Sequence, residues 1–307
     1  MAEGVRPGRA DLHLHSTASD GTHSPEQLLR GAAQCGLEWI AICDHDTAPD
    51  PGAWATRARE YGLRTLPGIE LGVYLSGESA SLAAPGAADK LDAGEVHLLA
   101  YGADPVTGPL ADLLLAARRD RHLRMLAMID RLEETGVHVT WEQVSAGMAP
   151  DASPGRPHLA EALVHSGYAS TIPAAFAQFI APGRPGYVPR RRVDVEEALV
   201  AIRASGGVPV LAHPGLYADP RPLIEYLVTL GLKGLEVIHP EHSFAQIRGL
   251  MECARRLDLL PSGGSDFHGR TGEPPLGSIY VPAGWARDLR DASMEAPSIH
   301  DNPGGEW

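Results

Sequence analysis

Short apolar segments alternate with amphipathic segments along most of this 307-residue chain, and this alternation limits the possible fold more than any other feature. The N-terminal part predicts a strand ending near His15, a helix over residues 24–36, a strand over 39–43 and a helix over about 53–61. A further strand, "LRTLPGIEL", is predicted to end in an acid. Strands and helices at this spacing are typical of parallel βα units, so we expect an α/β fold.

The alternation is interrupted from about residue 109. Apolar residues recur there at helical spacing up to Gly136, and further short helices are predicted after it. We therefore expect a helical insertion domain over 107–184 between two βα segments, 8–106 and 185–283, the second ending in a strand over 277–281. Residues 284–307 show no periodicity and are expected to form a flexible tail.

Residues 76–94 are rich in small side chains and show no periodicity. We expect them to form a solvated loop, with a lid over a nearby site as the less favoured alternative.

Composition narrows the function. The net charge of −13, from 39 acidic and 26 basic side chains, argues against a broad grip on duplex nucleic acid. The longest apolar runs fall far short of the roughly 18 to 20 residues that a membrane span needs. The N-terminus lacks the apolar core of a signal peptide, and the three cysteines lack zinc-binding spacing. These features predict a cytoplasmic protein without a membrane partner, and its oligomeric state stays open.

The 14 histidines are the main chemical signal, because many of them fall inside or just after apolar segments. His13 and His15 are two residues apart at the end of a predicted strand, so both rings face the same side. Other histidines and acids follow further predicted strands. The candidate metal ligands are His13, His15, Asp20, His45, Glu70, His97, His213, Asp266 and His268.

In parallel α/β folds the ends of the strands meet at one rim, where active sites lie. Burying so many imidazoles and carboxylates together is costly without cations between them. A structural role as hydrogen-bonded core histidines is the alternative, and we favour the metal cluster.

Eight segments in order carry a family resemblance: "DLHLHSTASDGTHSP", "ICDHDT", "PGIEL", "HLLAYG", "RPHLAEAL", "VLAHPG", "GLEVIHPEHS" and "SGGSDFHG". Over residues 10–282 the chain resembles the polymerase-and-histidinol-phosphatase (PHP) superfamily of metal-dependent phosphoesterases. It is most similar to the branch of 3′,5′-nucleotide bisphosphate phosphatases and 5′ to 3′ exonucleases. The resemblance implies a distorted (β/α)7 barrel with a small helical insertion and two or three divalent ions.

The resemblance also distributes the nine ligands. His13, His15, Glu70 and Asp266 are expected to bind one ion, and Glu70 with His97 and His213 a second. Asp20, His45 and His268 are expected to bind a third. Among these ligands Glu70, His213 and Asp266 are the expected catalytic residues. Mixed histidine and carboxylate ligation suits manganese, zinc or iron, and the family branch favours manganese.

Basic residues outside the cluster are candidates for binding the substrate. By resemblance, Arg156 and His158, at the predicted start of a helix, are phosphate binders. Arg184 has a basic counterpart in the family, and His242 either lines the pocket or supports the ligands with His239. Arg190, Arg191 and Arg192 form a run of positive charge that we expect to be solvated.

These features together predict a phosphoesterase that releases phosphate from a small nucleotide such as a 3′,5′-bisphosphate. We expect attack by metal-bound hydroxide without a phosphorylated enzyme intermediate, because two close cations activate water and neutralise the phosphoryl oxygens. The alternatives are another phosphatase or cyclic phosphodiesterase, a short-oligonucleotide 5′ to 3′ exonuclease and, least favoured, a non-catalytic metal-binding module.

Overall fold

The computed structural model describes residues 8–86 and 94–295. Its strands are β1 (Arg9–Leu14), β2 (Trp39–Ile42), β3 (Arg64–Thr65), β4 (Glu70–Tyr74), β5 (Glu95–Tyr101), β6 (Val208–Leu211), β7 (Gly234–Ile238), β8 (Leu260–Gly263) and β9 (Val281–Pro282). The α-helices are α1 (Pro25–Gln34), α2 (Pro51–Glu60), α3 (Gly108–Glu134), α4 (Trp141–Val144), α5 (Arg156–His165), α6 (Ile172–Ala175), α7 (Val195–Ala204), α8 (Pro220–Thr229), α9 (Phe244–Arg256) and α10 (Ala283–Glu295). Shorter turns of helix are η1 (Gly77–Ala83), η2 (Phe176–Ile180) and η3 (Pro214–Leu216).

The strands form two sheets, ordered β3-β2-β1-β9 and β4-β5-β6-β7-β8. Pairing is parallel through β1, β2 and β3 and through β6, β7 and β8, whereas β5 is antiparallel to both of its neighbours. Single bridges link the two sheets, between Leu14 and Phe267 and between His45 and Glu70. The α/β class is therefore confirmed, but the described strands make two sheets rather than one closed ring.

Helix starts follow the local signals in the sequence. Ser24 accepts a hydrogen bond from the backbone N–H of Gln27, Gln27 bonds back to Ser24, and Pro25 occupies the first turn of α1. Ser243 and Gln246 make the same reciprocal cap at the start of α9. These caps fix where each helix leaves the preceding loop, and in α9 that loop carries His239 and His242.

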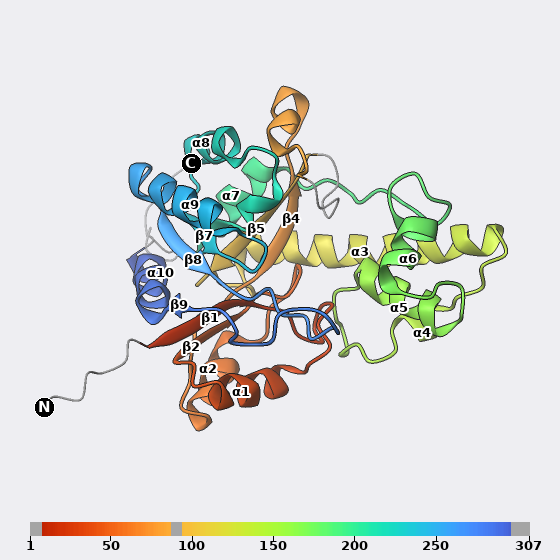
Figure 1. Cartoon of the computed structure of the whole chain (residues 1–307), viewed down its shortest axis with the longest axis horizontal. Helices are drawn as coiled ribbons and strands as arrows, with labels where there is room; N and C mark the ends of the chain where they lie inside the picture. The colour runs from red at the N-terminus through yellow and green to blue at the C-terminus, as the bar shows by residue number, and fades with distance from the viewer. Residues whose placement is uncertain (1–7, 87–93, 296–307) are drawn as a thin grey trace, which may run out of the picture.

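The helical part of the chain lies to one side of the strands, and α3 runs from the strands into it (Figure 1). Leu110, Leu113 and Leu114, near the start of α3, pack in the core formed with β4, β5 and β6. From Met125 onward the same helix packs with α4, α5 and α6 around a separate apolar cluster that ends at Ile180. We call residues 125–180 the helical unit.

Several sequence predictions need correction. Residues 283–295 form α10 rather than a loose tail, with Ala286 and Leu289 buried against the β1 side of the core. The predicted last strand shrinks to the two residues of β9. The sequence does not predict α10 because only a narrow stripe of small and apolar residues on this helix is buried. Residues 296–307 lie outside the described residues.

Two further corrections concern the segment between residues 64 and 94. Glu70 begins β4 rather than ending a strand, because β3 stops at Thr65. Part of the expected loop, residues 77–83, forms η1, and residues 87–93 of that loop lie outside the described residues.

None of the helices that the structure describes is long and apolar enough to cross a bilayer.

Candidate metal centre

The nine candidate ligands, although they come from six separate segments of the chain, lie together at one rim of the sheets. Their side chains come from β1 and the loop after it (His13, His15, Asp20), from the loop after β2 (His45), from β4 and β5 (Glu70, His97), and from the loops after β6 and β8 (His213, Asp266, His268). The antiparallel direction of β5 explains why His97 lies near the start of its strand. That start pairs with the end of β6, which leads to His213.

Glu70 is at the centre of this cluster. Its Oε2 atom lies 3.2 Å from His15 Nε2 and 3.1 Å from His45 Nδ1. Its Oε1 atom lies 2.7 Å from His97 Nδ1 and 3.1 Å from His213 Nε2. One carboxylate therefore faces imidazoles on both of its oxygens, as a bridging ligand between two cations would.

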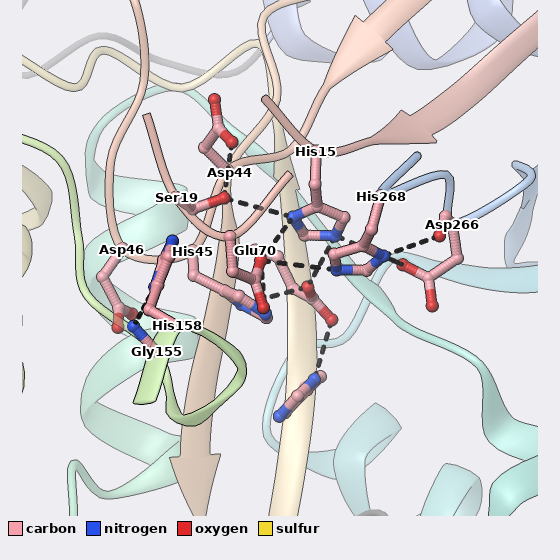
Figure 2. Close-up of polar contacts among 12 residues, drawn as sticks. His15, Ser19, Asp44, His45, Asp46, Glu70, Gly155, His158, Asp266 and His268 are labelled. Atoms are coloured by element: carbon pink, nitrogen blue, oxygen red, sulfur yellow. Dashed lines mark hydrogen bonds and ion pairs between the residues drawn. The ribbon is translucent and has the colours of Figure 1, made fainter. Parts of the chain in front are cut away.

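Two more carboxylates face the same rings from other sides. Asp266 Oδ1 lies 3.2 Å from His15 Nε2 and 3.6 Å from His13 Nε2. Asp20 Oδ1 lies 3.4 Å from His268 Nε2 and 3.8 Å from His45 Nε2. Figure 2 shows His15, Glu70, Asp266 and His268 pointing toward one another.

Burial and charge set the protonation of these groups. Burial opposes a charge on His15 and His97, but the facing carboxylates raise the pKa of His15 to about 10 and that of His97 to about 9. Burial would raise the pKa of Glu70, yet His45, His97 and His13 hold it well below its ordinary value. Burial lowers the pKa of His45 to about 3. Without a cation, protons on some of the imidazoles compensate the buried carboxylates.

The donor set fits divalent cations. Three groups of ligand atoms each lie within 4.8 Å of one another: His15, Asp20, His45 and His268; His13, His15 and Asp266; and Glu70, His97 and His213. Asp20 Oδ1, His45 Nδ1 and His213 Nδ1 are buried and have no hydrogen-bond partner among the described residues. His45 Nδ1 is close to Glu70 Oε2 but the pair lacks hydrogen-bond alignment. Buried polar atoms without partners are rare, so these atoms fit a role as ligands.

Two of the candidate ligands have a strained backbone conformation. His213 has a φ of 30° and Asp266 a φ of 50°, both in the left-handed region that side chains rarely adopt. Such strain persists only where the surroundings enforce it. At His213 the enforcing contact is a hydrogen bond from its backbone N–H to Glu236 Oε2, at 2.6 Å.

Glu236 is a site residue that the sequence analysis missed. It is fully buried on β7, and its Oε1 atom lies 3.0 Å from His13 Nδ1. One carboxylate thus orients the His13 ring and the His213 backbone together. A lone acid within the apolar segment "GLEVI" was the available signal, of the same kind as the histidines in other strands.

Other buried groups support the ligands from behind. Asp44 accepts hydrogen bonds from the hydroxyls of Ser16 and Ser19, and Ser19 in turn lies 3.4 Å from His15 Nδ1 (Figure 2). His239 Nε2 lies 3.5 Å from Asp266 Oδ2. Such contacts hold metal ligands in one orientation and raise their basicity.

The candidate substrate binders have different surroundings. His158 is buried in the first turn of α5, where its Nδ1 atom accepts a hydrogen bond from the backbone N–H of Gly155. Arg156 is in the same turn, with its guanidinium 5.7 Å from the centre of the Phe176 ring. A Cβ atom added to Gly155 would lie 3.6 Å from Asp20 Oδ2, so this turn lies against the metal cluster. Arg184 is exposed in the turn after η2.

His242, a predicted substrate binder, uses both of its ring nitrogens in hydrogen bonds to the backbone. Its Nδ1–H donates to the carbonyl of Val237, at 2.9 Å, and its Nε2 accepts from the backbone N–H of Gly215, at 3.0 Å. Both ring nitrogens therefore hydrogen-bond to backbone groups, and these bonds connect the loop after β7 to η3. Burial lowers its pKa to about 4, as expected for a neutral ring in this role.

The prediction of a solvated run over residues 190–192 is wrong for its first member. Arg190 is buried and its guanidinium contacts Asp46, which also binds Arg121 of α3. Arg191 and Arg192 are exposed as expected. Nothing in the sequence distinguishes Arg190 from Arg191 and Arg192, because the three arginines are adjacent.

A mixed α/β fold with a rim of buried histidines and carboxylates is typical of metal-dependent hydrolases, and similarity to known proteins identifies the family. Residues 11–145 match the PHP domain. The chain is 33% identical to a phosphoribosyl 1,2-cyclic phosphate 1,2-diphosphodiesterase from Eggerthella lenta, over 89% of this chain and 99% of that one. It is 31% identical to a 3′,5′-nucleoside bisphosphate phosphatase from Chromobacterium violaceum (84% and 86%) and to a 5′-3′ exoribonuclease from Salmonella typhimurium (89% and 90%).

Solved structures agree with this assignment. A Bifidobacterium adolescentis protein assigned to the metal-dependent phosphoesterases superposes with a TM-score of 0.80 at 29% identity, covering 97% of this chain and all of that one. The chain belongs to the PHP family and is a metal-dependent phosphoesterase. The resemblance seen in the sequence motifs is confirmed.

Proposed function

We propose that this enzyme hydrolyses a phosphate monoester of a small nucleotide, converting a 3′,5′-nucleoside bisphosphate to a nucleoside 5′-monophosphate and phosphate. The observation that supports this most is the position of the first turn of α5 against Asp20. That turn brings Arg156 and His158 to the edge of the metal cluster, and a helix N-terminus favours an anion. A compact phosphate group suits a site built in this way.

We propose two or three divalent ions, with manganese favoured, held by the nine ligands named above. When bound, such ions lower the pKa of water and neutralise the phosphoryl oxygens. In this proposal Glu70, His213 and Asp266 hold the reacting groups in place, while Arg156, His158 and Arg184 bind the phosphates. Ser16 and Ser19 donate their hydroxyls to Asp44, which supports direct attack by water rather than a phosphorylated serine.

We also propose that the two sheets together make the distorted (β/α)7 barrel of the family, with the insertion over 107–184. The bridges from Leu14 to Phe267 and from His45 to Glu70 support this, because they join the sheets at both sides of the metal centre.

A second candidate is a cyclic phosphodiester of ribose. It is favoured by the Eggerthella lenta diphosphodiesterase, which aligns over 99% of its length at 33% identity. Both candidates are small phosphorylated riboses, and both agree with the net charge of −13, which disfavours long nucleic acid.

A substrate panel with manganese tests the proposal. Adenosine 3′,5′-bisphosphate, a ribose 1,2-cyclic phosphate, a 5′-phosphorylated oligoribonucleotide and a sugar phosphate are compared by kcat/KM. We expect the bisphosphate to be the best substrate, with adenosine 5′-monophosphate and phosphate as products. Preference for the cyclic phosphate would replace the first candidate by the second. Preference for the oligonucleotide would contradict both.

Replacing Arg156 tests the phosphate-binding role. Arg156→Ala removes a charged hydrogen-bond donor, for which a loss of about 1.5–3 kcal/mol is typical, roughly a 10- to 100-fold change. If its contact is equal in the ground and transition states, the change falls on KM and leaves kcat in place. Arg119→Ala, on an exposed position of α3, is the control and should match wild type. An unchanged KM in Arg156→Ala would remove this residue from the site.

A further inference from the structure

Arg190 differs from its neighbours in being enclosed by acids. Its guanidinium contacts Asp46 through Nη2, and its Nη1 atom lies 3.9 Å from Glu95 Oε1. Its exposed fraction is 8%. A buried arginine is stable only when its charge is matched, so this position is built for it. None of the metal-binding or substrate-binding roles above uses Arg190.

The backbone of β4 leaves room for this side chain. A Cβ atom added to Gly72 would lie 2.2 Å from Arg190 Nη1, which is a clash. Gly72 pairs directly with His97 across β4 and β5. The guanidinium of Arg190 therefore lies against the backbone of Gly72, beside the candidate ligand His97. A residue larger than glycine at position 72 would occupy this space.

Glu95 connects Arg190 to that ligand. Glu95 and His97 are two residues apart on β5, so their side chains share one face of the sheet. Glu95 Oε1 lies 3.4 Å from His97 Nε2, and on the other side of the ring Glu70 Oε1 lies 2.7 Å from Nδ1. Without a cation, carboxylates face both ring nitrogens. When a cation is bound on the Glu70 side, Nδ1 must be free of its proton, and ionised Glu95, which can only accept a hydrogen bond, then favours the tautomer with the proton on Nε2.

We propose that Glu95, held in place by Arg190, is a positioning residue that fixes the tautomer and orientation of His97, so that Nδ1 presents its lone pair to the Glu70 side of the metal centre. This inference rests on the proposed metal-dependent function. Asp46 is the second anchor of Arg190, and Arg121 binds the same carboxylate from α3. These contacts link Arg121 of α3 through Asp46 to Arg190, and Arg190 through Glu95 to His97.

Two substitutions of Glu95 distinguish this positioning role from a role in packing alone. Among the described residues, two arginines (Arg121 and Arg190) and two carboxylates (Asp46 and Glu95) meet in this buried group. Glu95→Gln keeps the shape and an oxygen acceptor but loses the charge that faces Arg190. Glu95→Ala removes the partner of His97 Nε2 altogether. A residue that acted through packing alone would give similar metal binding in Glu95→Gln and wild type.

Metal binding to the full chain, stripped with a chelator, provides the test. Each variant is titrated with Mn²⁺ by calorimetry and with Co²⁺ by visible absorption, whose bands report the ligand field. We expect Glu95→Ala and Arg190→Met to weaken one class of sites by about 10- to 100-fold, the range for residues that support a metal ligand. Glu95→Gln should show a smaller loss and a shifted Co²⁺ spectrum. The matched controls Arg191→Met and Glu197→Ala, both exposed, should equal wild type.

Each outcome decides the inference. Unchanged affinity and an unchanged Co²⁺ spectrum in Glu95→Gln and Arg190→Met overturn it, even if the alanine variant fails to fold. An equal loss at every class of sites, or the same loss in Arg191→Met, also overturns it. Wild type that binds no divalent ion overturns the proposed function as well, whereas an active, metal-binding wild type with unaffected variants overturns the positioning role alone.

Discussion

The metal centre and the helical unit are stabilised in opposite ways. Within the metal centre, buried imidazoles and carboxylates face one another around Glu70, and burial by itself disfavours their charges. Within residues 125–180, apolar side chains such as Met128, Leu132 and Leu159 are fully buried against one another. The helical unit is therefore stabilised mainly by burial of apolar side chains, whereas the metal centre needs protons or cations to compensate its buried carboxylates. A change in pH or metal concentration should therefore alter the stability of the metal centre and leave that of the helical unit nearly unchanged.

The largest expected effect comes from removing a carboxylate of the metal centre. In Asp266→Asn, His13 and His15 lose an anionic partner, and with it one metal site should fail. Since metal ions contribute several kcal/mol to phosphoryl transfer, we expect kcat/KM to fall by roughly a thousand-fold or more. Metal content by mass spectrometry and activity with manganese are the two measurements. His138→Ala, at a 70% exposed side chain, is the control. Full activity in Asp266→Asn would mean that the cluster is structural.

A cavity in the helical unit should have the reverse consequence. Leu132 is fully buried in that unit, so Leu132→Ala should lower the free energy of unfolding by about 2–5 kcal/mol, as measured in urea. Metal content should stay at its wild-type value because no candidate metal ligand lies in the unit. Leu115→Ala, on the same helix but 62% exposed, should cost less than about 0.5 kcal/mol. Metal loss in Leu132→Ala beyond that of the control would show that the two regions depend on each other.

The metal centre and the helical unit were predictable from different sequence signals, for physical reasons. A histidine within an apolar strand is conspicuous because burial penalises it, and His13, His97 and His213 were predicted as ligands on that basis. The helical unit was predicted from periodicity, which follows burial of one helix face.

Residues whose role depends on distant partners were not predictable. Arg190 and Arg191 are adjacent and chemically identical, yet one is buried because Gly72, Asp46 and Glu95 surround it. His242 looked like a rim residue because its two backbone partners, Val237 in β7 and Gly215 in η3, are brought to its ring only by the fold. The candidate ligands could be predicted from the sequence, whereas the residues that contact them from other elements could be identified only from the fold.

The smallest effect expected is a pH dependence confined to the metal centre, and its two parts have opposite signs. In the metal-free protein the pKa values of His15 and His97 lie at about 10 and about 9, above the ordinary value of 6.5, because the facing carboxylates outweigh burial. Groups with raised pKa values stabilise the fold fully below 6.5 and lose that contribution as the pH rises through 9 and 10. Chelator-treated protein should therefore melt at a lower temperature at pH 9.5 than at pH 7.

Metal affinity should change in the other direction. A cation needs neutral imidazoles, so binding at pH 7 must release the protons of His15 and His97, at a cost of about tenfold in affinity per proton for each pH unit. Affinity should rise toward pH 9, and calorimetry in two buffers of different ionisation enthalpy should detect the released protons. Because metal then replaces the protons between the carboxylates, the metal-loaded protein should keep its melting temperature over the same range. A metal-loaded protein that follows the metal-free one downward with pH would show that cations do not take over this role, and the contrast with the helical unit would lose its physical basis.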